Sequence, residues 1–374
     1  MKILHIIPGL GKGGAERLVL DICTRLAAIS GIEIKLFCFS GKNDYYTKPC
    51  PQFIEVIPAS INLSVLHKNS FDVMALEKAI KNYDPDVIHT HLFEAEIVSR
   101  SVDFPKARWF SHCHDNMKQF ADFSSKTLFN KQRLTNFYEK KYLLRRYKKN
   151  GGTHFIAIST ATKGYFELTV PQYPVTLLHN AIDYMKFYNE RKPLDAGEKP
   201  LMINVGSMVE NKNQEFLLLV ADIMNKKGFD FELHFLGDGV TRNRLESRSV
   251  HLGLSGNVYF HGSVNNIEDY LRKSNLYVHS AKSEALGLTI IEAMASGLPV
   301  ITLDGRGNRD LIEQDKNGYM IFEHDPEKFA NHIIELWQDR KKYHELSSYA
   351  QQYARQYDIQ QYVDSLLEIY SGKV

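Results

Sequence analysis

The sequence predicts an α/β protein made of two doubly wound domains, each a parallel sheet with helices on both faces. The chain has 374 residues, a length that suits about two domains of average size. Short apolar segments alternate with segments of helical periodicity along the whole chain, which is the pattern of βαβ units. This rhythm stops near residue 180 and starts again at Leu201. The repetition predicts two sheets rather than one.

The first domain is predicted over residues 1–180. Its strands are expected at residues 2–7, 33–39, 87–91, 108–112 and 153–158. The segment 15–29, which follows the first strand, has apolar residues at helical spacing and is expected to form a helix that buries one face. Strands joined through helices form parallel sheets by right-handed crossovers.

The second domain is predicted over residues 181–357, after a boundary near residues 180–183 and a polar linker at 191–200. Its strands are expected at residues 201–205, 232–236, 258–260, 276–279 and 300–303. The last helix, over residues 359–370, is apolar along one face and must bury it. In sheets of this kind, ligands bind beyond the carboxyl ends of the strands.

The composition is that of an ordinary globular protein, with a net charge of +2. The sequence contains no run of eighteen apolar residues, so no membrane span is predicted. The N-terminus lacks the cleavage pattern of a signal peptide. The four cysteines form no C-x-x-C pair and are expected to be reduced thiols. We therefore expect a cytoplasmic protein. The cysteines are Cys23, Cys38, Cys50 and Cys113.

The segment 117–152 holds ten basic and two acidic side chains among many aromatic ones, a net charge of +8. Two interpretations stay open. The segment is either a solvated helix with a buried aromatic stripe, or a surface that meets anionic phospholipid or a phosphorylated acceptor. No nucleic-acid motif accompanies it, so nucleic acid is not an expected partner.

A glycine loop at residues 9–14 follows the first strand and satisfies G-x-G-x-x-G. That pattern is the dinucleotide fingerprint, and it makes a dehydrogenase the rival enzyme. The fingerprint also needs an acid at the end of the second strand, to hold the ribose. Here the only acid of that strand, Glu33, lies at its beginning, and the strand leads into Ser40 and Gly41. The dehydrogenase interpretation is therefore disfavoured.

Two H-x-H pairs lie at strand ends of the first domain, His89 with His91 and His112 with His114. Residues i and i+2 of a strand share a face, so each pair offers two metal ligands. No cysteine or carboxylate cluster completes a ligand set, and no metal is expected. A hydrolase that uses His114 and Asp115 is disfavoured too, because adjacent residues of an extended chain point to opposite faces and no G-x-S-x-G elbow is present.

The most informative pattern is Glu284 and Glu292, separated by seven residues where a strand gives way to a helix. The helix ends at Gly297, and Pro299 opens the next strand. A carboxylate at such a junction accepts hydrogen bonds from hydroxyls, and the free N–H groups of the first helical turn attract an anion. Hydroxyls and a diphosphate are what a nucleotide-sugar presents.

The Glu284–Glu292 segment resembles the E-x7-E motif of the family 4, group 1 retaining glycosyltransferases, which have the GT-B fold and include enzymes of bacterial surface-polysaccharide biosynthesis. Residues 13–17, Gly-Gly-Ala-Glu-Arg, are similar to the G-G-A-E-R of that family, and the resemblance covers nearly the full chain. It implies two Rossmann-like domains facing across a cleft. The first would be the acceptor side and the second the donor side, with a C-terminal helix at about 358–374 packing back on the first.

In the donor domain, the resemblance implies that Lys212 clamps the donor phosphates, while Ser207 stands where the family has an arginine. Glu284 would meet sugar hydroxyls and Glu292 the ribose. Further donor-binding positions are Gly237, in a turn near the base, and Gly287 and Leu288 at the helix terminus. Two arginines, Arg306 and Arg309, are candidates for the missing cation.

In the first domain, the resemblance implies that Gly13 and Gly14 approach the donor diphosphate or the acceptor. Glu16, Arg17 and His112 would lie on the acceptor side. The family has a histidine beside the anomeric centre, and His114 takes that role here, with His112 as the alternative.

The implied reaction is retaining, metal-independent transfer of a sugar from a nucleoside-diphosphate sugar, for which UDP is the expected base. The acceptor would be a hydroxyl of a glycan or of a polyprenyl- or lipid-linked saccharide, and no cofactor is required. The protein would be cytoplasmic, or peripheral on the inner face of the cytoplasmic membrane. Two alternatives remain, a nucleotide-sugar-binding scaffold that has lost catalysis, suggested by Ser207, and a UDP-GlcNAc epimerase of the same fold.

Overall fold

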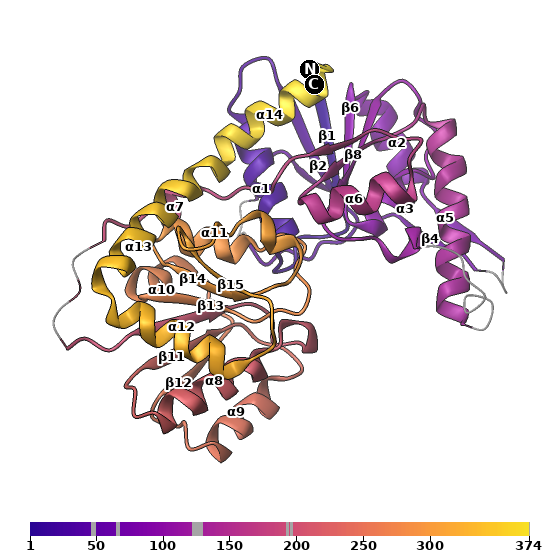
Figure 1. The fold of residues 1–374 in the computed structure, drawn as a ribbon. Helices are drawn as coiled ribbons and strands as arrows, with labels where there is room; N and C mark the ends of the chain where they lie inside the picture. The colour runs from indigo at the N-terminus through magenta and orange to yellow at the C-terminus, as the bar shows by residue number, and fades with distance from the viewer. Residues whose placement is uncertain (46–49, 65–67, 122–129, 192–193, 195–196, 374) are drawn as a thin grey trace. The chain divides into compact units, whose positions relative to one another are not determined.

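The computed structural model describes residues 1–374 except 46–49, 65–67, 122–129, 192–193, 195–196 and 374. Parts of the basic segment 117–152 and of the linker 191–200 therefore lie outside the described residues. The chain divides into two compact units, unit 1 with Met1–Asn180 and Ile359–Val374, and unit 2 with Ala181–Asp358 (Figure 1). Each is an α/β unit built on a parallel sheet, which confirms the predicted fold class.

Unit 1 is built on a seven-stranded parallel sheet in the order β3-β2-β1-β6-β7-β8-β9. In that order the strands are β3 (Ile54–Val56), β2 (Glu33–Cys38), β1 (Lys2–Ile7), β6 (Val87–His91), β7 (Arg108–Cys113), β8 (His154–Ala157) and β9 (Val175–Leu177). A separate antiparallel pair consists of β4 (Ser60–Asn62) and β5 (Ser70–Asp72).

Among the described residues, unit 1 has α1 (Gly14–Ala27), α2 (Met74–Tyr83), α3 (Phe93–Ser99), η1 (Lys118–Phe120), α5 (Lys131–Lys149), α6 (Thr160–Thr169) and α14 (Ile359–Ser371). The last helix of the chain, α14, packs beside α1 (Figure 1). Its apolar face is buried there, including Val363 and Leu366. A guanidinium N–H of Arg108 in β7 donates to the carbonyl of Tyr370, which ties the end of α14 to the sheet.

Unit 2 is built on a six-stranded parallel sheet in the order β12-β11-β10-β13-β14-β15. The strands are β12 (Val258–Gly262), β11 (Glu232–Leu236), β10 (Leu201–Val205), β13 (Leu276–His279), β14 (Val300–Leu303) and β15 (Gly318–Ile321). The longer helices are α8 (Gln214–Lys226), α9 (Arg242–His251), α11 (Leu288–Ala295), α12 (Pro326–Gln338) and α13 (Arg340–Ala354). Shorter ones are α7 (Tyr184–Phe187), η2 (Glu210–Lys212), α10 (Ile267–Lys273), η3 (Gly307–Asp310) and η4 (Arg355–Tyr357).

Both sheets reverse their winding direction beside their first strand. In unit 1 the order runs outward from β1 to β2 on one side and from β1 to β6 on the other, and in unit 2 the corresponding pair is β10 and β13. At such a switch point the loops after the two central strands diverge and leave a crevice at the carboxyl edge of the sheet, where ligands of doubly wound proteins bind. The crevices at β1/β6 and at β10/β13 are therefore the places to look for a site.

The strands that sequence patterning missed are short. Strands β3 and β9 have three residues each, too few to show an apolar period, and β15 has four and begins with a glycine. The first residue of β15, Gly318, lies so close to β14 that a Cβ there would be 2.0 Å from the carbonyl oxygen of Val300. The described helices include none that is long and apolar enough to cross a membrane. All four cysteines are free thiols, and only Cys50 is exposed.

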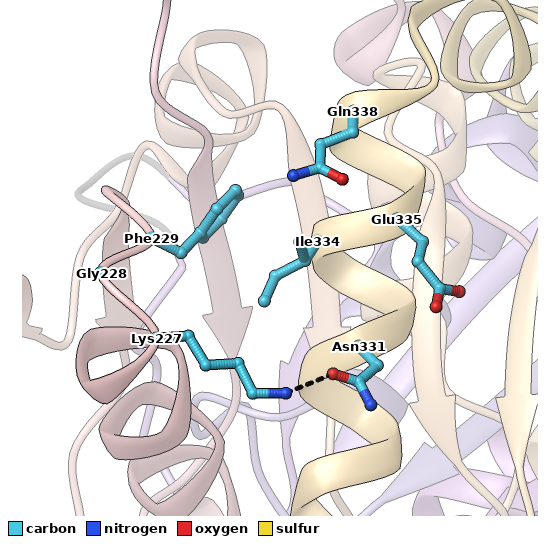
Figure 2. Close-up of a pocket in the computed structure, with 7 residues that line it drawn as sticks. All are labelled: Lys227, Gly228, Phe229, Asn331, Ile334, Glu335 and Gln338. Carbon is cyan, nitrogen blue, oxygen red and sulfur yellow. Dashed lines mark hydrogen bonds between the residues drawn. The ribbon is translucent and has the colours of Figure 1, made fainter.

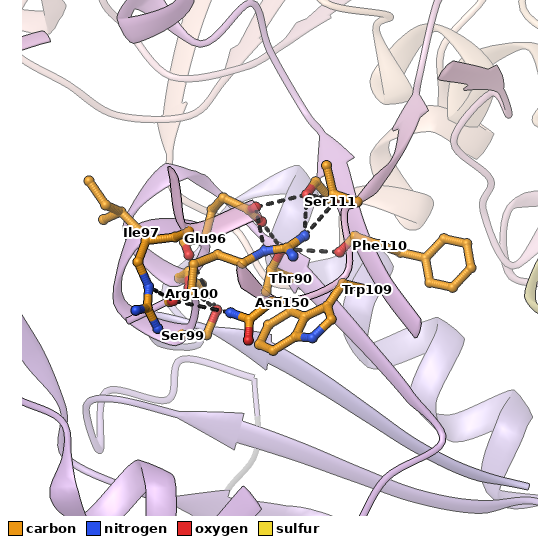
Figure 3. A network of polar contacts seen from close by, with 12 residues as sticks. Thr90, Glu96, Ile97, Ser99, Arg100, Trp109, Phe110, Ser111 and Asn150 are labelled. Atoms are coloured by element: carbon orange, nitrogen blue, oxygen red, sulfur yellow. Dashed lines mark hydrogen bonds and ion pairs between the residues drawn. The ribbon is translucent and has the colours of Figure 1, made fainter. Parts of the chain in front are cut away.

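A buried ion pair holds α3 against the sheet of unit 1 (Figure 3). Nε of Arg100 donates to Oε1 of Glu96 at 3.0 Å, and both side chains are at most 1% exposed. Arg100 also donates to the hydroxyls of Ser111 and Thr153, at 3.2 and 2.5 Å, and Ser111 donates to Glu96 at 2.8 Å. A second carboxylate oxygen of Glu96 accepts from Thr90. Burial of two charges is tolerable because each has several hydrogen-bond partners.

Candidate functional site

An ion pair between Lys212 and Glu284 lies at the β10/β13 switch point of unit 2. Lys212 ends η2, in the loop that follows β10, and Glu284 lies in the loop that follows β13. Nζ of Lys212 donates to Oε2 of Glu284 at 2.6 Å, and the two side chains are 25% and 14% exposed. The two residues that the sequence predicted for phosphate and sugar binding are therefore in direct contact and reachable from solvent.

The carboxylate of Glu284 is held in its ionised form. Burial favours the neutral acid, but the polar contact with His279 and the charge of Lys212 outweigh it, and the pKa of Glu284 falls to about 2. Nε2 of His279 lies 3.2 Å from the Glu284 carboxylate, although it is out of line for a hydrogen bond. A carboxylate with this pKa accepts hydrogen bonds at neutral pH and does not act as a general acid.

Hydrogen bonds join the loop after β10 to the loop after β13. Nδ2 of Asn211 donates to the carbonyl of Ser283 at 2.8 Å, and the N–H of Lys282 donates to the carbonyl of Asn211 at 2.9 Å. The hydroxyl of Ser280 donates to the carbonyl of Lys212 at 2.9 Å. These contacts set the position of Lys212 from the β13 loop, so the ion pair is preorganised by the fold.

The loop after β14 packs its backbone against Glu284. The N–H of Glu284 donates to the carbonyl of Gly305 at 2.8 Å, and the N–H of Gly307 donates to the carbonyl of Glu284 at 3.1 Å. Between these glycines, Arg306 has φ of 71° and ψ of −63°, a conformation that is strained for a residue with a side chain. Its side chain is exposed and forms no close ion pair with the described residues, although Asp304 lies near enough to interact with its charge. Arg309, by contrast, is paired with Asp304.

Replacing Gly307 by alanine is expected to destabilise unit 2 by about 1–3 kcal/mol. The added methyl group would overpack the loop, because the atoms that it meets are backbone atoms that cannot easily move away. An added Cβ would lie 2.1 Å from the carbonyl oxygen of Ala285. Thermal unfolding measures the effect. Gly256→Ala is the matched control, since nothing lies within 4 Å of its Cβ position. Equal melting temperatures for both variants would show that the two loops are not packed as described.

Ser207 and Gly237 lie in loops that touch through their backbones. A Cβ on Gly237, which has φ of 132°, would be 2.0 Å from the carbonyl oxygen of Gly206, so only glycine fits there. The side chain of Ser207 is exposed, and its carbonyl accepts from Gln214 at 3.1 Å. The structure thus places the position of the expected family arginine at the surface of the β10 loop, with a hydroxyl in place of a cation.

Helix α11 starts directly after the ion pair. Gly287 is its N-cap with φ of 103°, and no side chain caps the helix, so the first-turn N–H groups at Leu288 are available to an anion. Glu292 is one turn into the helix and is half-buried. Below the first turn, the hydroxyl of Tyr277 lies 2.7 Å from that of Thr289 and anchors α11 to β13.

The glycine loop of unit 1 borders a pocket of about 360 Å³ at the β1/β6 switch point. The pocket is lined by Pro8, Gly9, Gly11, Glu16, Phe39, Ser40, Lys42, Ala59, Leu92 and Glu94. Gly13 and Gly14 cap and start α1 beside it. The hydroxyl of Tyr45 holds the loop, 2.9 Å from the nitrogen and 2.7 Å from the oxygen of Gly13. Of the three predicted acceptor-side residues, Glu16 lines the pocket, whereas Arg17, paired with Asp21 at 2.9 Å, and His112 do not.

Partial burial raises the pKa of Glu16, because it disfavours the charged carboxylate relative to the protonated acid.

The histidines of unit 1 differ in what their ring nitrogens contact. His112 is fully buried, with its ring nitrogens 3.2 Å from His89 and from Asn180. His114 is half-buried, with Nε2 at 3.1 Å from His91 and with no partner for Nδ1 among the described residues. Of the predicted pair, only His114 has a ring nitrogen left for a ligand.

A second pocket, of about 400 Å³, lies in unit 2 between the end of α8 and α12 (Figure 2). Its lining includes Lys227, whose Nζ donates to Asn331 at 2.6 Å, together with Phe229 and Ile334. None of the predicted site residues lines it. The larger of these two pockets is therefore not where the Lys212–Glu284 pair lies.

Several contributors were not predicted from the sequence. His279 ends β13 and lies beside Glu284, and the backbone bridge of Glu284 to Arg306, itself a predicted candidate cation, was not foreseen. In unit 1, His5, Asn180 and Tyr370 contact the H-x-H histidines. For His5 and His279 a signal existed, because each is a polar residue within an otherwise apolar strand. Tyr370 gave none, since a tyrosine on an apolar helix face indicates only burial.

Comparison with known proteins identifies the class to which this fold and site belong. The profile of "Glycosyltransferase Family 4" matches residues 12–185, and that of "Glycosyl transferases group 1" matches residues 186–353. Together the two matches cover both units. The chain belongs to the group 1, family 4 glycosyltransferases.

Three relatives illustrate the range of similarity. The glycosyltransferase EpsD of Bacillus subtilis is 29% identical over 162 residues, which are 43% of this chain and 42% of EpsD, less than half of either. The capsular polysaccharide biosynthesis glycosyltransferase CapH of Staphylococcus aureus is 24% identical over 100% of this chain and 99% of CapH. HepE of Anabaena, solved in complex with UDP and glucose, is 20% identical with a TM-score of 0.77 over 99% of both chains. The likeness to HepE establishes a shared fold.

Proposed function

We propose that the protein transfers a sugar, with retention of anomeric configuration, from a UDP-sugar to a hydroxyl of a glycan or lipid-linked acceptor. The observation that carries this proposal is the Lys212–Glu284 pair at the β10/β13 switch point, next to the uncapped start of α11. One cation, one ionised carboxylate and free helical N–H groups match a diphosphate attached to a sugar.

The proposed roles follow from charge. Lys212 and the first turn of α11 stabilise the negative charge that develops on the departing diphosphate, which is the main contribution that such a site can make. Glu284 accepts hydrogen bonds from hydroxyls of the transferred sugar, and Glu292 from those of the ribose. His114 would contact the sugar near its anomeric carbon. No pair of carboxylates is assigned as general acid and base, so the leaving phosphate oxygen takes the acceptor proton, and no metal is required.

The missing arginine at Ser207 is replaced, in this proposal, by Arg306. This residue lies next to Glu284 in the β14 loop, and its exposed guanidinium forms no close ion pair with the described residues. Arg309 does not suit the role because Asp304 already binds it through Nε and Nη2. The strained backbone of Arg306 is of the kind found at ligand-binding positions.

The donor and acceptor classes are supported by the relatives. HepE was solved with UDP and glucose, which favours a UDP-sugar, and CapH acts in capsular polysaccharide biosynthesis, which favours a glycan acceptor. In the proposed division of labour, unit 2 holds the donor and the β1/β6 pocket of unit 1 receives the acceptor.

A thermal-shift screen over UDP-, GDP- and ADP-sugars tests the donor site. A ligand at one hundred times its dissociation constant stabilises the folded state by about 2.7 kcal/mol, so UDP-sugars are expected to raise the melting temperature clearly. Lys212→Ala should lose this shift. The control is Lys282→Ala, an exposed lysine in the neighbouring loop. No shift with any UDP-sugar, in a folded protein, would contradict the proposal.

Helix α5 would place unit 1 at an anionic membrane. Lys141, Arg145 and Lys148 follow one another at spacings of four and three, so they share one exposed face. Other basic residues of α5 are engaged within the protein, such as Arg146 and Lys149, which pair with Asp103. Leu143 and Tyr147 face the core. The helix thus buries one face and presents a basic one that forms no ion pair with the residues that the structure describes.

Replacing Lys141, Arg145 and Lys148 by glutamine is expected to weaken binding to phosphatidylserine vesicles by roughly 100-fold, since each cation contributes about 1 kcal/mol at an anionic surface. Vesicle sedimentation measures it. A control of equal net charge replaces Lys226, Lys328 and Lys341, three exposed lysines of unit 2. If the wild-type protein stays in the supernatant with anionic vesicles, the membrane role is wrong.

A further inference from the structure

The buried histidines of unit 1 form one continuous hydrogen-bonded chain. It starts at His114, passes through His91, His5, Tyr370, His89 and His112, and ends at Asn180. The successive distances are 3.1, 2.8, 3.2, 2.5, 3.2 and 3.2 Å. Each inner histidine uses Nδ1 toward one neighbour and Nε2 toward the other. This histidine chain connects β1, β6 and β7 with α14, so all of it lies in unit 1.

The hydrogen-bond acceptor at one end of this series of side chains sets the donor-to-acceptor direction of every hydrogen bond in it. A neutral imidazole has one N–H and one bare nitrogen, so it passes on the orientation that it receives. Oδ1 of Asn180 accepts, which puts the proton of His112 on Nε2 and leaves its Nδ1 to accept from His89. The proton of His89 is therefore also on Nε2, and its Nδ1 accepts from the hydroxyl of Tyr370.

Tyr370 then carries the orientation to the other half of the chain. Its hydroxyl proton is used toward His89, so its oxygen accepts from Nε2 of His5. Nδ1 of His5 in turn accepts from Nε2 of His91, and Nδ1 of His91 accepts from Nε2 of His114. All five imidazoles are thus Nε2–H tautomers, and the last bare nitrogen is Nδ1 of His114.

Burial keeps the histidines neutral, as this scheme requires. His5, His89, His91 and His112 are fully buried. Desolvation lowers the pKa of His5 to about 3 and that of His112 to about 4, and it lowers those of the other three as well. No carboxylate belongs to the chain. A charged imidazole would present two N–H groups and break the orientation on one side.

Ring stacking argues against a metal as the occupant of this cluster. The nitrogens of His5, His89 and His91, and those of His91, His112 and His114, lie close enough together to suggest one. However, the rings of His112 and His114 are stacked at 4.2 Å with an interplanar angle of 16°, and those of His89 and His91 at 4.4 Å and 30°. Stacked rings direct their lone pairs side by side, whereas ligands of one zinc ion point toward a common centre. The nitrogens are already paired with one another.

We propose that Asn180 and Tyr370 act as positioning residues, which hold His114 as the Nε2–H tautomer through the histidine chain and keep its Nδ1 an unprotonated hydrogen-bond acceptor. At this nitrogen a ligand hydroxyl donates its hydrogen bond, whereas a ligand carbonyl or carboxylate finds no donor. In catalysis this rests on the proposed function, since His114 would receive a hydroxyl of the donor sugar. The tautomer itself does not depend on that function.

NMR of the ¹⁵N-labelled histidine rings in the whole protein tests the proposal, because long-range couplings between ring protons and ring nitrogens distinguish the two neutral tautomers. The wild-type protein is expected to show His114 with its proton on Nε2 at pH 7. Tyr370→Phe removes the link between the two halves of the chain, so nothing fixes the direction of the His5–His91–His114 half. His114 is then expected to populate both tautomers, each at about one half.

Tyr362→Phe is the matched control. Tyr362 lies on the same helix and is buried, but its hydroxyl has no hydrogen-bond partner among the described residues, so its loss should leave His114 unchanged. A proton on Nδ1 of His114 in the wild type would overturn the proposal, and so would an unchanged tautomer in Tyr370→Phe. Loss of the ring N–H signals on adding one equivalent of Zn²⁺ would also overturn it, in favour of a metal site. The measurement needs no turnover, so it is independent of whether sugar transfer is found.

Discussion

Glu284→Gln is expected to lower the turnover of sugar transfer by about 10²–10³-fold while leaving the fold intact. The substitution keeps the size of the side chain but removes the charge that binds Lys212 at 2.6 Å. It also puts an amide N–H where, in the proposed site, the sugar hydroxyls need an acceptor. Losing one preorganised electrostatic contact at a reacting centre costs about 3–4 kcal/mol in the transition state. Initial rates at saturating donor, with circular dichroism to verify folding, measure the effect.

The control for this substitution is Glu323→Gln, which breaks another Lys–Glu pair of unit 2. Glu323 pairs with Lys328 at 2.9 Å, but both side chains are largely exposed, and such pairs contribute about 0–1 kcal/mol. Full activity is expected for this variant. A folded Glu284→Gln enzyme with wild-type turnover would contradict the assignment of the site.

The pH dependence of stability has a definite sign at Glu284. Its folded pKa, about 2, is below the value of about 4.3 for an unfolded glutamate. The ion pair therefore stabilises the folded state fully above that unfolded value and is lost as the pH falls toward 2. At the pH of an activity assay near neutrality, the carboxylate stays ionised, so its titration does not shape the profile.

Arg100→Leu is expected to destabilise unit 1 by about 3–5 kcal/mol, because it leaves the carboxylate of Glu96 buried without its cation. Arg100 is 0% exposed and Glu96 is 1% exposed. The guanidinium also stacks over the rings of Trp109 and Tyr147, with its carbon 4.3 and 4.6 Å from their centroids. Hydrogen exchange of the β6 and β7 amides measures the free energy of unfolding in this unit alone.

Two further variants show whether the loss comes from the unpaired charge. Lys163→Met breaks the exposed pair with Glu167 on α6 and should cost less than about 1 kcal/mol. The double variant Glu96→Leu with Arg100→Leu removes both buried charges and should recover part of the loss, since replacing a whole buried pair by apolar groups is often close to neutral. A loss below about 1 kcal/mol for Arg100→Leu would mean that the ion pair is not buried as described.

The sequence predicted the fold well because, in an α/β protein, the local pattern of apolar residues indicates most strands and helices. Strands β1, β6, β10, β11, β13 and β14 have the predicted bounds, since each is a short, mostly apolar run bounded by loop residues. Strands β3 and β9 were missed because they have only three residues each, and β15 because it begins with a glycine, so tertiary contacts decide their pairing. At β15 it is the space for Gly318 against β14 that matters.

The site was predictable only in part. The Glu284 and Lys212 positions came from a motif, and the structure brings them within 2.6 Å of each other. The strained Arg306 and the contact of His279 with Glu284 depend on how separate loops meet, which spacing does not encode. The histidine chain is a similar case. Two H-x-H pairs predict shared faces, but only the packing of α14 inserts Tyr370 between His5 and His89.

The most direct test of the central claim follows the anomeric carbon through one reaction. The protein is incubated in EDTA with a UDP-sugar labelled with ¹³C at that carbon and with glycan or lipid-linked acceptors, and the product is examined by NMR. We predict that UDP is released and that the new glycosidic bond keeps the anomeric configuration of the donor. Inversion, a strict requirement for Mn²⁺, or binding of UDP-sugar without turnover on any acceptor would contradict the account.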